Sequence, residues 1–169
     1  TSTVTISNPT PTITVSGTLN AFTKCNGSVS TSQSFSVSGT NMVAGITITP
    51  PTGFEVSTTS DFSSNVGTNS SVITVGSSGT IASTTIFVRM QATANNSSYS
   101  AADIVLSSSN AITRNVSASG SVTSLPTISG TLSVTTGGTS QLTGSGTANT
   151  TTPWTSSNTS VATVSNTGL

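Results

Sequence analysis

The sequence predicts an all-β protein that is built of antiparallel β-sandwiches and nearly free of helix. Three observations support this fold class. Val, Ile and Thr fill 63 of the 169 positions, a β-branched content that favours pleated strands. Apolar residues alternate with Ser and Thr, and turn residues interrupt the alternation about every 8–12 positions. No stretch keeps the i, i+3, i+4, i+7 apolar spacing of an amphipathic helix without interruption.

The composition also separates the chain from disordered Ser/Thr-rich stalks. Ser and Thr make up 73 residues, but Leu, Ile, Val and Phe still make up 37 of 169, just above the roughly 20% below which disorder is expected. The formal net charge is zero, whereas highly charged disorder needs a net charge. We therefore expect enough apolar surface for a folded core.

Both domain boundaries are predicted from an internal duplication. Residues 11–19 (PTITVSGTL) return in shortened form as residues 126–132 (PTISGTL), and an alternating stretch precedes each copy. The pattern indicates the last strand of one domain, a short Pro linker and the first strand of the next. We expect residues 1–8 to be the last strand of a preceding repeat, 9–122 a complete sandwich and 123–126 a linker.

Seven or eight strands are expected between these boundaries, in the following order. They are centred on Ile13, Phe35 and Val37, Ile46 and Ile48, Phe54 and Val56, Val72 to Val75, Ile86 to Met90, Ile104 and Leu106, and Ile112 to Ala118. Such a count in about 100 residues is typical of an immunoglobulin-like sandwich. The alternation assigns a single core between the two sheets, formed by Phe35, Val37, Ile46, Ile48, Phe54, Val56, Ile86, Val88, Ile104, Leu106 and Val116.

Residues 127–169 are expected to form an incomplete second sandwich. Strands are predicted at 132–134, 137–142, 154–158 and 161–164, but about 44 residues remain where a full domain needs about 100. The missing strands would come from a continuation of the chain or from another chain. No initiator Met or signal peptide is present, so we expect an interior segment of a longer protein.

Two parts of the chain resemble known families. Residues 137–142 (GGTSQL), 154–158 (WTSSN) and 161–169 (VATVSNTGL) resemble the bacterial Ig-like group 2 domain. Residues 34–39 (SFSVSG) and 46–57 (ITITPPTGFEVS), together with 84–90 and 115–120, resemble the Ser/Thr-rich repeats of very large Bacteroidetes surface proteins, among them gliding adhesins of the SprB kind. This resemblance implies export by the type 9 secretion system and display as outer-membrane-anchored extracellular filaments.

The composition argues against several functions. The chain has no His and only six charged residues, so acid–base catalysis would have to rely on the widely separated Glu55, Asp61 and Asp103. We expect no enzyme, cofactor or metal site. Three scattered cations cannot neutralise a run of phosphates, so we do not expect nucleic-acid binding. The sequence contains no run of 18 apolar residues, so we expect no membrane span.

The leading hypothesis is a structural spacer in a large cell-surface adhesin. Its partners would be neighbouring Ig-like repeats of the same chain, with the type 9 secretion machinery added by the resemblance. The alternative is an Ig-like module that itself binds a carbohydrate or a solid surface. The single Trp and single Tyr argue against that alternative, because sugar-binding platforms usually need exposed aromatic faces.

Four individual residues need an interpretation. Trp154 is expected to anchor the core of the second unit, with ligand binding as the alternative. Tyr99 is expected either to pack at an edge or to form a tyrosine corner, in which its hydroxyl bonds back to the backbone. Lys24 is a candidate for an isopeptide bond promoted by Glu55, but a solvated loop is preferred. Cys25 is expected to be a small buried or half-buried residue, with a disulfide bridge to another chain or a partner domain as the alternative.

Overall fold

The structure, a computed structural model, describes residues 8–95, 97–146 and 154–168. The chain divides into two compact units, the first ending at Thr123 and the second beginning at Ser124, which places the division at the predicted linker. Among the described residues there is no helix, and hence none that could cross a membrane. Except for Asn8, the strand predicted at 1–8 lies outside the described residues.

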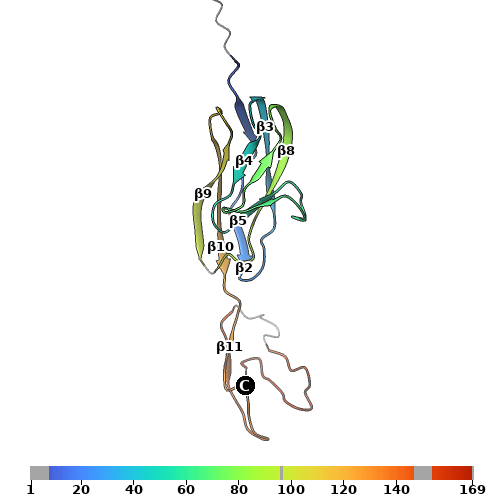
Figure 1. The fold of residues 1–169 in the computed structure, drawn as a ribbon. Helices are drawn as coiled ribbons and strands as arrows, with labels where there is room; N and C mark the ends of the chain where they lie inside the picture. The colour runs from blue at the N-terminus through green and yellow to red at the C-terminus, as the bar shows by residue number, and fades with distance from the viewer. Residues whose placement is uncertain (1–7, 96, 147–153, 169) are drawn as a thin grey trace, which may run out of the picture. The chain divides into compact units, whose positions relative to one another are not determined.

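The first unit is a sandwich of two five-stranded sheets (Figure 1). The first sheet is antiparallel throughout, in the order β1 (Thr12–Ser16), β3 (Gln33–Met42), β8 (Gly79–Met90), β5 (Phe54–Ser57) and β6 (Val66–Gly67). The second sheet has the order β2 (Phe22–Cys25), β10 (Arg114–Thr123), β9 (Ser98–Ser107), β4 (Ile46–Thr49) and β7 (Ile73–Val75). Here only the β2–β10 pair among the described strands is parallel. The predicted all-β sandwich is confirmed.

The strand order is that of an immunoglobulin-like fold. The neighbours β1, β3, β8 and β5 correspond to strands A, B, E and D, and β10, β9 and β4 correspond to G, F and C. The first strand is split between the sheets, because the chain leaves β1 at Gly17 and joins the second sheet as β2. Gly17 has a φ of 103°, and a Cβ there would lie 3.3 Å from the Cα of Phe35. Only glycine therefore makes this crossing without strain.

The core lies between the two sheets, as the alternation predicts. All eleven predicted core residues are buried and belong to one cluster. The sequence missed several members, and these also point inward from the strands: Ile13, Phe22, Met42, Ile73, Val75, Ile81, Met90, Ala118 and Val122.

Several local predictions in the first unit are wrong. The strand β2 occupies residues expected to form a polar turn, and the short strand β6 was also missed. Ile112 lies in the turn before β10 and is 72% exposed, so the last strand begins later than predicted. The first two errors share a cause, since β2 and β6 are short strands at a sheet edge, and such strands depend on their neighbours more than on their own pattern.

In the second unit, the described residues form a single two-stranded antiparallel sheet of β11 (Ile128–Gly130) and β12 (Leu142–Gly144). The strands predicted at 132–134, 154–158 and 161–164 are not formed, and Leu132, Val134 and Val161 are exposed. An isolated two-stranded sheet has little surface against which further strands could bury apolar side chains.

Candidate functional site

The charged side chains of the first unit are mostly tied into local structure. Glu55 and Arg89 face each other across β5 and β8, and Arg89 Nε donates a hydrogen bond to Glu55 Oε1 at 2.6 Å. The guanidinium carbon of Arg89 also lies 3.9 Å from the centre of the Phe62 ring. This arrangement is a cross-strand ion pair covered by an aromatic ring, and it holds the loop between β5 and β6 on the sheet.

The other two acids have hydrogen-bond donors beside them. The hydroxyl and backbone N–H of Ser63 donate to Asp61 Oδ1 at 2.8 and 3.1 Å, and these bonds lower the pKa of Asp61 below its ordinary value. Asn115 Nδ2 donates to Asp103 Oδ2 at 2.6 Å. In the part of the chain that the structure describes, no three metal-ligating side chains gather into one group.

Lys24 is not in a solvated loop, which corrects the sequence interpretation. It lies on β2 with its side chain turned inward beside Phe22, and it is only 7% exposed. Its ammonium group donates to the carbonyl oxygens of Ala92 at 3.2 Å and Cys25 at 3.5 Å. Glu55 is engaged with Arg89 on the outer face of the other sheet. The structure therefore does not bring together the side chains that an isopeptide bond would need.

Cys25 is exposed, although the sequence interpretation expected a buried or half-buried side chain. It alternates with Lys24 on β2, so the burial of one side chain turns the other outward. The residue stands opposite Thr123, whose hydroxyl lies 3.9 Å from the cysteine sulfur.

Tyr99 has the geometry of a tyrosine corner, one of its two expected roles. It lies near the start of β9, the counterpart of strand F, and the backbone N–H of Asn95 donates to its hydroxyl at 3.1 Å. The Tyr99 hydroxyl in turn donates to Asn95 Oδ1 at 3.2 Å. These bonds join the β8–β9 connection to the strand that follows it.

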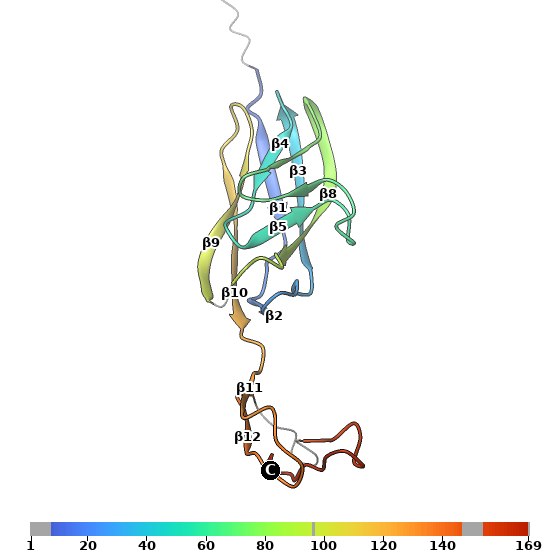
Figure 2. The same ribbon diagram turned by 60° about the horizontal axis from the view of Figure 1, so that its bottom comes forward.

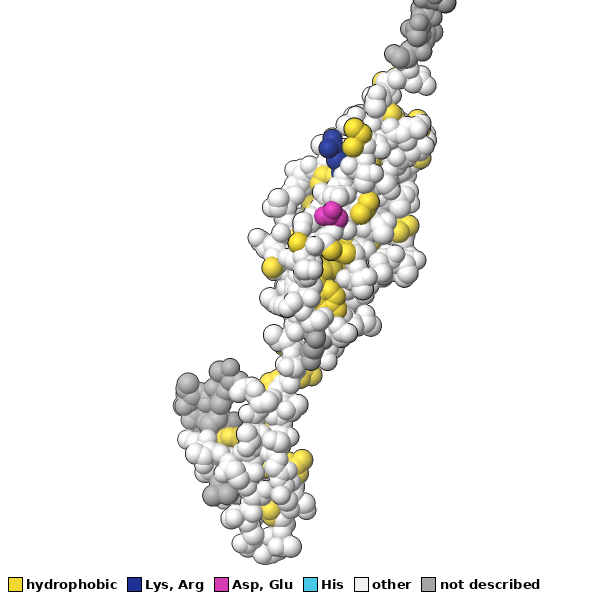
Figure 3. Space-filling model, turned by 90° about the vertical axis from the view of Figure 1, so that its left-hand side faces the viewer, with side chains coloured by type: hydrophobic (Ala, Val, Ile, Leu, Met, Phe, Trp, Pro, Cys, Tyr) yellow, Lys and Arg dark blue, Asp and Glu magenta, His cyan; other side chains and the backbone are white. Residues whose placement is uncertain are grey.

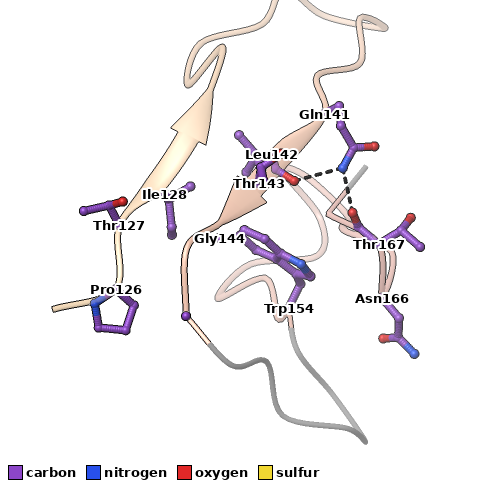
Figure 4. Close-up of a pocket in the computed structure, with 11 residues that line it drawn as sticks. Pro126, Thr127, Ile128, Gln141, Leu142, Thr143, Gly144, Trp154, Asn166 and Thr167 are labelled. Atoms are coloured by element: carbon purple, nitrogen blue, oxygen red, sulfur yellow. Dashed lines mark hydrogen bonds between the residues drawn. The ribbon is translucent and has the colours of Figure 1, made fainter. Parts of the chain in front are cut away.

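The second unit has a hollow of about 440 Å³ beside Trp154 (Figure 4). Pro126, Ile128 and Leu142 contribute apolar surface, and Trp154 is half-buried rather than part of a closed core. It lies in no strand, so the predicted third strand is wrong. The indole ring lies beside Gly144, where a Cβ would be 3.7 Å from its Cζ2 atom.

The floor of this hollow is held by hydrogen bonds to the last described residues. Gln141 Nε2 donates to the carbonyl oxygens of Leu142 at 2.9 Å and Thr167 at 2.6 Å (Figure 4). The N–H of Leu142 donates to Gly168 O at 2.9 Å, so the segment around Thr167 lies along β12. The hollow thus combines an aromatic face, an apolar floor and polar side chains such as Asn166 at its edge.

Comparison of the chain with protein-family models and with curated proteins gave no match. The burial of Lys24 is the feature of these candidate residues that the sequence interpretation missed. A signal was present, because Phe22 and Lys24 alternate with two exposed residues and a Lys stem can be buried like an apolar side chain.

Proposed function

We propose that this chain is a structural spacer in a large extracellular adhesin, built of tandem Ig-like sandwiches. The observation that carries the proposal is the path of the chain through the first unit. The chain enters at one end of the sandwich near β1 and leaves at the other end through β10 (Figure 2). A domain with this path can be joined end to end with copies of itself, which is how a repeat adds length to a filament.

The surface chemistry supports the same proposal. The outward positions of β1 and β3 carry hydroxyl side chains in register, with Thr14 opposite Ser38 and Ser16 opposite Ser36. Charged side chains are sparse on the face drawn in Figure 3. Hydroxyl groups keep a sheet wettable without charge, and an uncharged surface responds little to salt. The family resemblance adds gliding adhesins and export by the type 9 system to the proposal.

The location of the protein tests this function. Antibodies raised against the chain should label intact cells of the source organism, and external protease should remove that label. Deleting the repeat from the parent gene should shorten the surface filament while leaving the rest of it displayed. Labelling that needs cell lysis would reject the proposal.

A second candidate function is carbohydrate binding, and the hollow beside Trp154 favours it. Trp154 is the one Trp of the chain, so its fluorescence reports directly on this hollow. If the chain binds glycans there, neutral oligosaccharides should change that emission, and a glycan array should give signals that Trp154→Ala abolishes. An array without signals would leave the spacer as the better proposal.

A further inference from the structure

The two terminal segments of the first unit run side by side in the same direction. Four residues of β2 pair in parallel with the end of β10, from Phe22 opposite Gly120 to Cys25 opposite Thr123. Beyond this ladder, the N–H of Asn26 donates to Thr123 O at 2.9 Å. At the other end, Arg114 at the start of β10 donates through Nε to Ile13 O in β1 at 3.2 Å.

This arrangement decides how the unit would respond to a pulling force. Force applied along the chain acts on the N-terminal end of β1 and β2 and on the C-terminal end of β10. In a parallel pair these two ends lie at opposite ends of the ladder, so pulling slides one strand along the other. All hydrogen bonds of the ladder then carry the load together, whereas a ladder pulled from one end breaks bond by bond.

Lys24 adds a second attachment for the same strand. Its ammonium group is bonded to the carbonyl oxygen of Ala92, in the connection between β8 and β9. Among the described residues its hydrogen-bond acceptors are carbonyl oxygens, so the contact needs no acid and holds β2 to the body of the sandwich. Sliding of β2 would therefore have to break the bonds of the ammonium group while it is still buried, as well as break the ladder.

We propose that the β2–β10 pair is the element of the first unit that resists a pulling force and that Lys24 anchors β2 in this pair. The inference deepens the proposed spacer function and rests on it only in supposing that the chain is under tension. It assigns mechanical strength to a few named contacts, and it makes that strength depend on the direction of pulling.

Single-molecule force measurements on the full chain test the direction. In a Cys25→Ser background, one set of molecules is held at the N-terminus and the C-terminus. The other set is held at the N-terminus and at an Ile112→Cys thiol, which is exposed in the turn before β10. The second geometry pulls β10 from its N-terminal end, upstream of the parallel pair that begins at Gly120, so the pair is not sheared and we expect a lower unfolding force. Equal forces in the two geometries would overturn the proposal.

The released length identifies the unit that unfolds. The 112 residues from Thr12 to Thr123 extend to at most about 370–400 Å, whereas the 46 residues of the second unit extend to at most about 150–165 Å. When the chain is held at residue 112 instead, only the 101 residues from Thr12 to Ile112 are released, at most about 330–365 Å. In each geometry we compare the force of the step with the length that belongs to the first unit.

A variant pair tests the anchor. Lys24→Met keeps most of the stem volume and removes the ammonium donors, so the end-to-end unfolding force should fall. Thr23→Ala changes the neighbouring, exposed position on β2 and should leave the force unchanged. An unchanged force in Lys24→Met would reject the anchoring role of Lys24. If that variant fails to fold, the comparison of the two pulling geometries still tests whether the β2–β10 pair resists the force. Cell-surface labelling is independent of these force measurements. Failure of the proposed role of the β2–β10 pair can therefore be distinguished from failure of the spacer function.

Discussion

Three aromatic rings meet in the first unit and join its two sheets to a corner. Phe22 and Phe54 pack edge to face with ring centres 5.6 Å apart, and Phe54 meets Tyr99 in the same way at 6.1 Å. The Tyr99 ring also covers Gly53, where a Cβ would lie 2.4 Å from the ring. The position of Tyr99 therefore depends both on the hydrogen bonds of its own hydroxyl and on the absence of a side chain at Gly53.

Tyr99→Phe tests the hydroxyl. The substitution keeps the ring contacts and removes the two hydrogen bonds to Asn95, so we expect a loss of about 0.5–1.5 kcal/mol for a bond of this kind. Thermal melting should show a midpoint lower by a few degrees. An unchanged midpoint would mean that Tyr99 stabilises the corner through its ring alone.

Gly53→Ala tests the close approach of backbone and ring. Gly53 has a φ of 88°, which costs an L-residue roughly 1–2 kcal/mol, and the new methyl group would also collide with Tyr99. Gly27→Ala is the matched control, because Gly27 has a φ of 80° and open space around it. In urea unfolding, Gly53→Ala should be clearly the less stable of the two variants. Equal losses would show that the ring moves aside at little cost.

At the scale of elements, the connection between β5 and β6 is attached to the sheet by side chains rather than by backbone pairing alone. Phe62 is buried with a φ of 56°, in a region that bulky residues rarely occupy, and its ring lies over Arg89. The ion pair between Arg89 and Glu55 lies beneath it. Phe62 thus holds the loop through apolar and cation–π contacts at once, and the buried Ser57 hydroxyl adds a hydrogen bond to Ser64 O at 2.9 Å.

A double-mutant cycle measures the cation–π contact. Phe62→Leu keeps an apolar side chain and removes the ring, while Arg89→Met removes the charge. We expect a coupling free energy of about 0.5–1 kcal/mol between the two changes, because Arg89 is only partly shielded from water. Urea unfolding of the four proteins provides the measurement. Additive effects would show that Phe62 contributes by burial alone.

At the scale of the whole molecule, few groups respond to pH. The chain has no His and three carboxylates, so the free energy of unfolding should be nearly constant between about pH 5 and 9. Asp61 affects the free energy of unfolding only below that pH range. Since folding lowers its pKa below 3.8, its contribution is present above that value and is lost as the pH falls through the folded pKa.

Thermal melting across this range at constant ionic strength checks the prediction. The midpoint should be flat from about pH 5 to 9 and should fall in acid, and Asp61→Asn should reduce the part of that fall that begins near pH 4. A midpoint that moves by more than about 4–8 °C between pH 5 and 9, roughly 1 kcal/mol for a domain of this size, would reveal a strongly perturbed group.

The sequence by itself determined the fold class, the division near residue 123 and most of the core of the first unit. These features follow from period-two alternation, which places residues such as Ile48 and Val88 on an inward face whatever strand lies beside them. Turn residues and the duplicated Pro-containing segment mark boundaries in the same local way.

Only the tertiary structure decided which strands pair and which polar groups are buried. Alternation places Lys24 and Phe22 on one face of β2 but does not name the neighbour, and the parallel pairing with β10 and the bond to Ala92 O join residues far apart in the sequence. Trp154, which is only half-buried, shows the same limit of sequence reasoning. The sequence motif around Trp154 predicted a buried aromatic residue, but a side chain is buried only where other strands supply a surface. The described part of the second unit contains a single two-stranded sheet.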